Sequence, residues 1–127
     1  MRRDLEVFVL HLINNERALA GLRPITPHAT IREAARRHAQ EMFAFCYLSH
    51  RSRDGRTPQQ RILDMGVRVR AVGENVAYAT DIRAAHGTLM SSLEHRGRIL
   101  SLTFRLVGVG VVVGGADDLI VVEDFAH

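Results

Sequence analysis

Three side chains that can bind a metal or move a proton stand far apart in the sequence, each beside an apolar segment. His50 follows the run Phe45-Cys46-Tyr47-Leu48-Ser49, Glu74 lies between Gly73 and Asn75, and His95 precedes Arg96-Gly97-Arg98. Scattered polar residues in short turn-rich segments are typical of side chains that converge on one pocket. We therefore expect His50, Glu74 and His95 to line a common cleft, each from a turn-rich segment.

Two neutral imidazoles can bind Zn²⁺ or another divalent cation, with His50 and His95 as ligands and Glu74 holding a water or orienting a ligand. Catalytic zinc sites usually have three protein ligands, so we expect weak, exchangeable metal. In an enzyme, Glu74 would be the general base and a metal-bound water the nucleophile. A hydrogen-bonded network that only fixes the cleft walls is the alternative. A catalytic role for His50, Glu74 and His95 stays open, but binding is favoured over catalysis.

Arginines follow both histidines directly. Arg51 and Arg53 come after His50, and Arg96 and Arg98 come after His95. If both segments face one cleft, these four side chains would form an anion-binding rim. The alternative is a set of ordinary solvated charges.

Composition limits the classes of function. The chain has 127 residues, 46% hydrophobic and 24% charged, which indicates one globular domain over residues 1–127. No apolar run is long enough to span a bilayer. All 17 basic residues are Arg, but no basic helix interleaved with aromatic residues predicts a nucleic-acid partner. The single cysteine, Cys46, excludes an internal disulfide, and we expect it to be buried, as we do His38.

Hydrophobic periodicity predicts four helices, over residues 4–20, 29–45, 57–66 and 81–93. Thr57-Pro58-Gln59-Gln60 has the signature of a capping box, and Asp81 is a suitable cap for the last helix. Residues 21–27 are predicted to be a loop and residues 67–71 a short strand. Residues 106–113 and 119–125 form an apolar hairpin around a turn at 114–118, whose strands we expect to be covered on both faces. This pattern predicts an α+β fold, a three-layer α-β-α sandwich with a central, mainly antiparallel sheet.

Five fragments in order resemble the CAP superfamily (cysteine-rich secretory proteins, antigen 5 and pathogenesis-related 1), and within it the bacterial SCP-like domains. The fragments are residues 12–22 and 34–42, the segment 48–62 that contains His50, the Gly73-Glu74-Asn75 motif, and residues 95–110. The resemblance implies the same sandwich and places His50, Glu74 and His95 in the central cleft. Many relatives have a second cleft glutamate where this chain has Ser92, with Glu94 as a displaced substitute.

The resemblance also implies an exported, monomeric domain located outside the cell or in the cell envelope, although the first residues lack the features of a signal peptide. The chain then either stays inside the cell or belongs to a longer exported protein. A domain of this kind is expected to act mainly by binding, with a lipid, a glycan or a cell-wall polymer as ligand. The alternatives are a metal-dependent hydrolase acting on peptide or cell-wall material, and a lipid-binding carrier.

Overall fold

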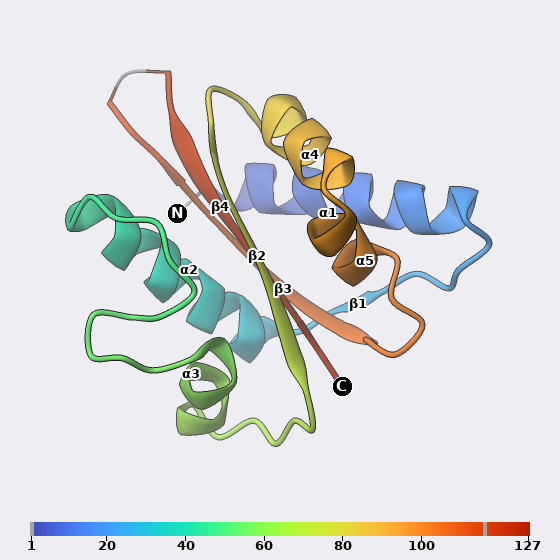
Figure 1. Ribbon diagram of the computed structural model, residues 1–127, viewed down its shortest axis with the longest axis horizontal. Coiled ribbons are helices and arrows are strands. Elements are labelled where there is room, and N and C mark those ends of the chain that lie inside the picture. The colour runs from blue at the N-terminus through green and yellow to red at the C-terminus, as the bar shows by residue number, and fades with distance from the viewer. Residues whose placement is uncertain (1, 116) are drawn as a thin grey trace.

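A four-stranded sheet forms the centre of the molecule (Figure 1). The structure is a computed structural model that describes residues 2–115 and 117–127. The strand order is β1-β3-β4-β2, with β1 (Thr26–Pro27), β2 (Val72–Ala79), β3 (Leu106–Val113) and β4 (Leu119–Ala126). The pairs β3–β4 and β2–β4 are antiparallel, and the short pair β1–β3 is parallel. The predictions of an α+β fold and of a central, mainly antiparallel sheet are confirmed.

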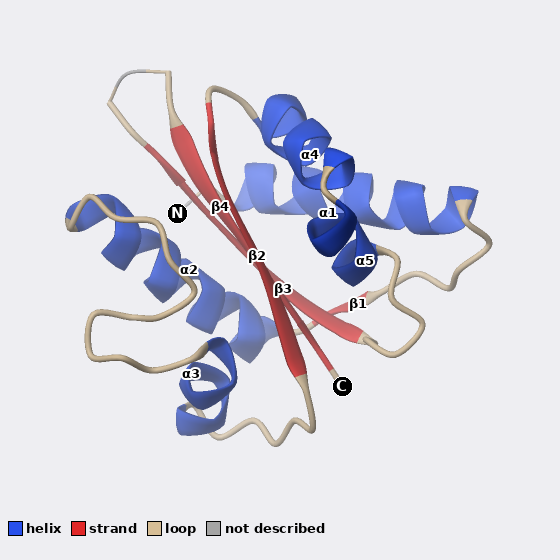
Figure 2. Cartoon of the chain, in the orientation of Figure 1, coloured by secondary structure: helices blue, strands red, loops and turns tan. Residues whose placement is uncertain are grey.

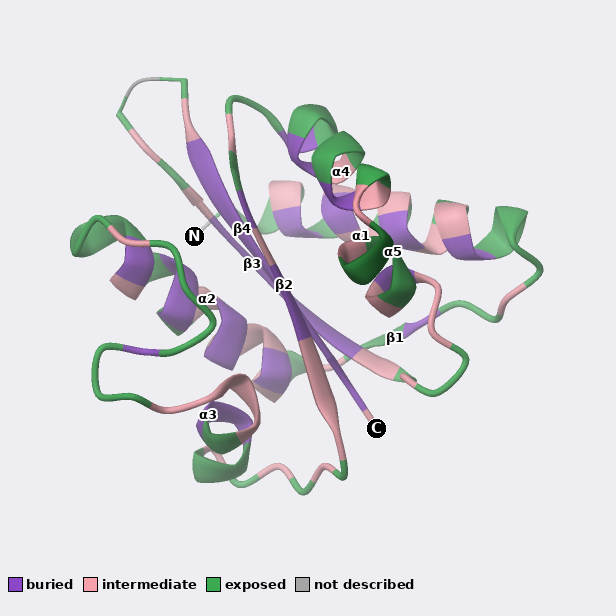
Figure 3. Ribbon diagram, in the orientation of Figure 1, coloured by how far each residue is buried: buried purple, intermediate pink, exposed green. Residues whose placement is uncertain are grey.

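Helices cover both faces of this sheet (Figure 2). One layer contains α1 (Arg3–Leu19), α4 (Ile82–Ser91) and α5 (Leu93–Ile99), and the other contains α2 (Ala29–Ala44) and α3 (Pro58–Asp64). No helix among the described residues is long and apolar enough to cross a membrane. Because helices cover both faces of the sheet, the apolar hairpin is buried on both sides, as its lack of alternation predicts. All eight residues of β4 are buried (Figure 3).

Two glycines of β3 let α2 lie directly on the sheet. A Cβ added at Gly108 would overlap the backbone of Ile31 and Arg32, and one added at Gly110 would overlap the backbone of Ala35 and Arg36. Fully buried Ala35 and Ala39 continue this contact with the sheet. The close approach fixes the position of α2, and with it the start of the loop that carries His50.

Both predicted helix caps are confirmed. Thr57 Oγ1 accepts from the Gln60 amide at 3.2 Å while Gln60 Oε1 accepts from the Thr57 amide at 2.9 Å, a complete capping box. Asp81 accepts from the Ala84 amide at 2.8 Å at the start of α4. The predicted turn at 114–118 includes Ala116, which lies outside the described residues.

The strand predicted at 67–71 is wrong. These residues form a loop, and β2 begins at Val72, where it pairs with Ala126, the last residue of β4. Residues before Val72 therefore have no partner strand. Val67 and Val69 alternate with arginines because they pack against the cluster formed by Ile31 and Ile62. Glu74 accordingly stands inside a strand, not in the expected turn.

Three further expectations need correction. Residues 93–99 form α5 after a break at extended Ser92, so His95 is helical. The loop at 21–27 contains the short strand β1, whose Thr26 amide donates to the carbonyl of Arg105. Cys46 is exposed, not buried, because the chain turns sharply after α2 and takes a positive φ of 55° at this residue.

Candidate functional site

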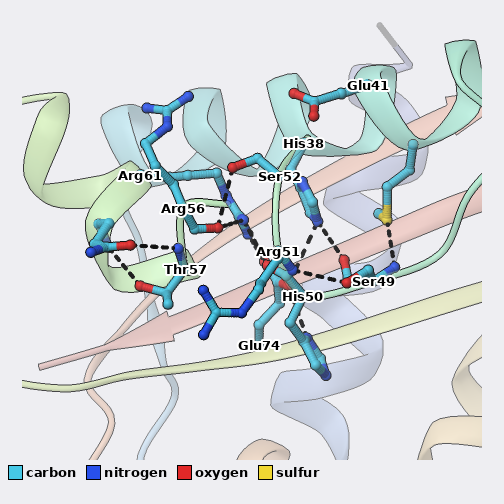
Figure 4. Close-up of polar contacts among 12 residues, drawn as sticks. His38, Glu41, Ser49, His50, Arg51, Ser52, Arg56, Thr57, Arg61 and Glu74 are labelled. Atoms are coloured by element: carbon cyan, nitrogen blue, oxygen red, sulfur yellow. Dashed lines mark hydrogen bonds and ion pairs between the residues drawn. The ribbon is translucent and has the colours of Figure 1, made fainter. Parts of the chain in front are cut away.

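The loop after α2 presents His50 and is fastened from two sides. His38, buried on α2 as expected, forms a 2.7 Å hydrogen bond through Nε2 with the carbonyl of Ser49. Arg61, on α3, donates Nη1 to the carbonyl of His50, also at 2.7 Å. Residues of two different helices thus hold the backbone on both sides of the Ser49–His50 peptide bond (Figure 4).

Glu74 lies beneath this loop with its carboxylate fully engaged. Strand alternation directs its side chain toward the α2 and α3 layer, where it is 3% exposed. Oε1 lies 3.0 Å from His50 Nδ1, and Oε2 accepts from Arg61 Nη2 at 2.5 Å (Figure 4). His38 Nε2 lies 3.9 Å from Oε1. Glu74 thus contacts His50 through one carboxylate oxygen and Arg61 through the other.

A second carboxyl group lies beside Glu74 on the neighbouring strand, β4. Asp124 is its partner in the β2–β4 register and is completely buried. Burial raises the pKa of both carboxyls, and the negative charge of Glu74 raises the pKa of Asp124 further. Arg61 lowers the pKa of both, whereas the hydrogen bond between the two carboxyls lowers the pKa of Glu74 and raises that of Asp124. Glu74 is therefore the member of the pair that stays ionised, and Asp124 keeps the proton.

Asn75 works on the opposite face of the same strand. Its Nδ2 donates to the carbonyl of His95 and to Glu123 Oε1, each at 3.1 Å. Its Oδ1 accepts from Arg98 Nη1 at 3.3 Å. Asn75 therefore fastens α5 to the sheet and sets the position of His95.

His50 belongs to the loop after α2 in one helical layer, and His95 belongs to α5 in the other. Burial lowers the pKa of both imidazoles, and the positive charge of Arg98 lowers each further. His50 also lowers the pKa of His95. Both rings are therefore neutral at neutral pH. The side chain of His50 is 50% exposed, and its Nδ1 is engaged by Glu74, which leaves Nε2 free.

Among residues 2–115 and 117–127, no group of three or more His, Cys, Asp or Glu side chains is arranged to hold a metal ion. Glu94, the proposed substitute for a second cleft glutamate, has a side chain 74% exposed that pairs with Arg98 at 2.8 Å. Ser92 lies at the break between α4 and α5.

The four arginines of the expected rim have different surroundings. Arg98 lowers the pKa of both histidines and bonds Asn75 and Glu94. Arg51 donates to the carbonyl of Gly55, and Arg53 stacks on the Phe45 ring at 3.6 Å. Arg96, on α5, is exposed.

Sequence reasoning missed two buried neighbours of Glu74. Arg61 lies beside the buried Ile62 on the inner side of α3, and Asp124 follows Glu123 in a strand whose other residues are apolar. Each is a charged residue at a position that the hydrophobic pattern assigns to the core. That conflict was a usable signal, because buried charges normally have a specific partner.

Known relatives share this sandwich of helices around a mainly antiparallel sheet. Residues 10–125 match the Cysteine-rich secretory protein family, CAP. The chain belongs to this family. It is 31% identical over 109 residues to the protein YkwD of Bacillus subtilis (strain 168), covering 85% of this chain and 42% of that protein.

Solved structures agree. An extracellular protein containing an SCP domain from Bacillus anthracis str. Ames superposes with a TM-score of 0.88 at 25% identity, covering 98% of this chain and 41% of that one. An outer surface protein from Borrelia burgdorferi shares the fold, with a TM-score of 0.92 at 17% identity and coverage of 99% and 94%. The chain thus spans less than half the length of the two Bacillus proteins.

Proposed function

We propose that this CAP domain is a binding domain whose ligand occupies the cleft between His50 and His95, and that the cleft takes a divalent cation such as Zn²⁺ weakly. One observation carries the proposal. Glu74 accepts the Nδ1 proton of His50 and thereby fixes the tautomer whose Nε2 lone pair is free to bind. His95 supplies a second neutral imidazole nearby. Two protein ligands leave the remaining coordination positions to water or ligand, so the affinity for metal is low.

The same geometry favours binding over hydrolysis. A general base must reach the proton that it removes, either directly or through one water. Both oxygens of Glu74 are occupied by His50 and Arg61, and Glu94 is paired with Arg98. A metal-dependent hydrolase acting on peptide or cell-wall material would therefore have to use one of the two histidines as its base.

The ligand that we propose is a lipid, a glycan or a cell-wall polymer met outside the cell or in its envelope by a monomeric domain. The extracellular and outer-surface descriptions of the Bacillus anthracis and Borrelia proteins support the location. Arg98 beside the cleft favours a ligand with anionic groups.

A separate groove favours the alternative of a lipid carrier. It has a volume of about 620 Å³ and is lined mainly by apolar side chains around the end of α2, including Met42, Phe43 and Leu48. That size falls within the usual range for ligand pockets. Saturable binding of a fluorescent fatty acid that is weakened by Leu48→Asp would support this function.

Zinc titration by calorimetry at neutral pH tests the cleft. We expect saturable 1:1 zinc binding by the wild type and an affinity at least about tenfold lower in His50→Ala and in His95→Ala. The double variant should not bind zinc. His11→Ala, which removes an exposed histidine on α1, is the matched control and should bind zinc as the wild type does.

The variant Glu74→Gln tests whether Glu74 contributes to zinc binding by orienting His50. If Glu74 acts through His50, this variant should bind zinc more weakly, by about tenfold, because the partners that orient metal-binding histidines have effects of that size. Zinc binding that is unchanged in His50→Ala/His95→Ala would mean that the histidines and Glu74 only fix the cleft walls.

A further inference from the structure

A second pocket lies where three segments meet beyond the end of α1. The loop after α1, the start of β1 and the loop between α5 and β3 come together at this end of the molecule (Figure 1). The pocket has a volume of about 520 Å³ and shares no residue with the histidine cleft. Its lining includes three arginines, Arg17, Arg23 and Arg105, and no carboxylate. It is therefore a concentration of positive charge without an acidic residue in its wall.

Arg17 is the unusual member of this set because it is only 4% exposed. Its Nε donates to the carbonyl of Arg23 at 2.8 Å, and its Nη1 donates to the carbonyls of Ile99 and Ser101 at 3.0 and 2.8 Å. Among residues 2–115 and 117–127 no carboxylate pairs with it, and burial lowers its pKa. A buried charge that has only neutral partners remains electrostatically uncompensated. By contrast, the buried Arg61 has Glu74 as its counter-ion.

Arg23 and Arg105 add two exposed guanidinium groups to the same wall. Among the described residues, neither side chain makes a hydrogen bond or an ion pair, so all of their donors are available. The guanidinium group presents its donors as a planar fork that matches phosphate and carboxylate oxygens in a bidentate way. The rest of the lining is partly apolar and includes Leu22, Leu102 and Phe104.

We propose that this pocket binds the phosphate group of a small phosphate monoester that also carries an apolar group. Arg23 and Arg105 bind the phosphate oxygens, and Arg17 supplies a fixed positive charge behind them. Phe104 and the two leucines contact the apolar group. The volume falls within the 300–1,000 Å³ range typical of small-molecule pockets. This site is independent of the function proposed for the histidine cleft.

Calorimetry with phenyl phosphate tests the site, with inorganic phosphate and phenol as probes of its two halves. We expect the wild type to bind phenyl phosphate saturably, inorganic phosphate more weakly and phenol not at all. In Arg23→Gln/Arg105→Gln the affinity for phenyl phosphate should fall at least about tenfold, since hydrogen bonds to charged groups are lost. Arg17 is left unchanged, because its hydrogen bonds join α1 to two loops.

Arg68→Gln/Arg70→Gln is the matched control, because it removes the same charge from two exposed arginines outside the pocket. It should bind phenyl phosphate as the wild type does, which separates the pocket from the net charge of the protein. Equal loss in both double variants, or unchanged binding in Arg23→Gln/Arg105→Gln, would overturn the proposal. So would the absence of phenyl phosphate binding by the wild type, or binding that is lost only in His50→Ala/His95→Ala.

Discussion

Replacing Arg61 by methionine tests whether the ion pair with Glu74 holds the His50 loop. The methionine keeps an apolar stem beside Ile62 but removes the donors to Glu74 and to the carbonyls of His50 and Arg56. Breaking a buried ion pair by removing one partner costs about 3–5 kcal/mol. We expect a loss at the lower end, about 3 kcal/mol, because His50 still donates to Glu74 and the carboxylate can take up a proton.

Urea denaturation followed by far-UV circular dichroism measures this loss. It should be largest at about pH 8, where Glu74 in the variant is a buried anion without its main counter-charge. It should shrink at about pH 5, because burial raises the pKa of Glu74 and a protonated carboxyl needs no counter-ion. Zinc affinity should fall as well, since the His50 carbonyl loses its anchor.

Two further variants decide the outcome. Arg68→Met removes an exposed arginine and should change the free energy of unfolding by less than about 0.5 kcal/mol. Arg61→Met/Glu74→Gln removes both charges and should recover much of the lost stability. A loss below about 1 kcal/mol at about pH 8, or a double variant no more stable than Arg61→Met, would refute the argument.

Other predictions concern buried groups elsewhere in the fold. Burial lowers the pKa of His38 from 6.5 to about 4, assisted by the charge of Arg61, so the unfolded chain takes up the proton first and stability falls as pH falls between these values. In His38→Gln, urea titrations should lack that fall. Burial raises the pKa of Glu123 from 4.5 to about 7, so the unfolded chain loses its proton first and stability falls as pH rises between those values. The free energy of unfolding of Glu123→Gln, relative to that of the wild type, should therefore rise by up to about 3 kcal/mol between about pH 4 and about pH 8. Gly108→Ala should lower the free energy of unfolding, measured by thermal denaturation, by about 3 kcal/mol or more, because its Cβ overlaps the backbone of α2. Gly87→Ala, whose Cβ has no atom within 4 Å and which lies within α4, should raise it by up to about 1 kcal/mol.

The sequence predicted the scaffold well where local chemistry decides structure. The Thr57 capping box, the Asp81 cap and the two-sided apolar hairpin depend on residues close in the chain or on a simple pattern. The strand 67–71 failed because pairing depends on where β4 ends, which no local pattern indicates. Arg61 and Asp124 were missed because their role exists only once α3 and β4 are both brought to Glu74.

Glu74 and Asn75 are consecutive residues of β2, which is an edge strand of the sheet. Glu74 contacts the side chain of His50 and Asn75 bonds the carbonyl of His95, so both segments are attached to the same strand. Small sliding of one helical layer against the other would therefore leave both attachments in place. A shift of β2 by one residue along β4 would exchange the faces of Glu74 and Asn75 and break both of these contacts together. The contacts of β2 with the His50 loop and with α5 are thus gained or lost as one unit, through the register of a single strand.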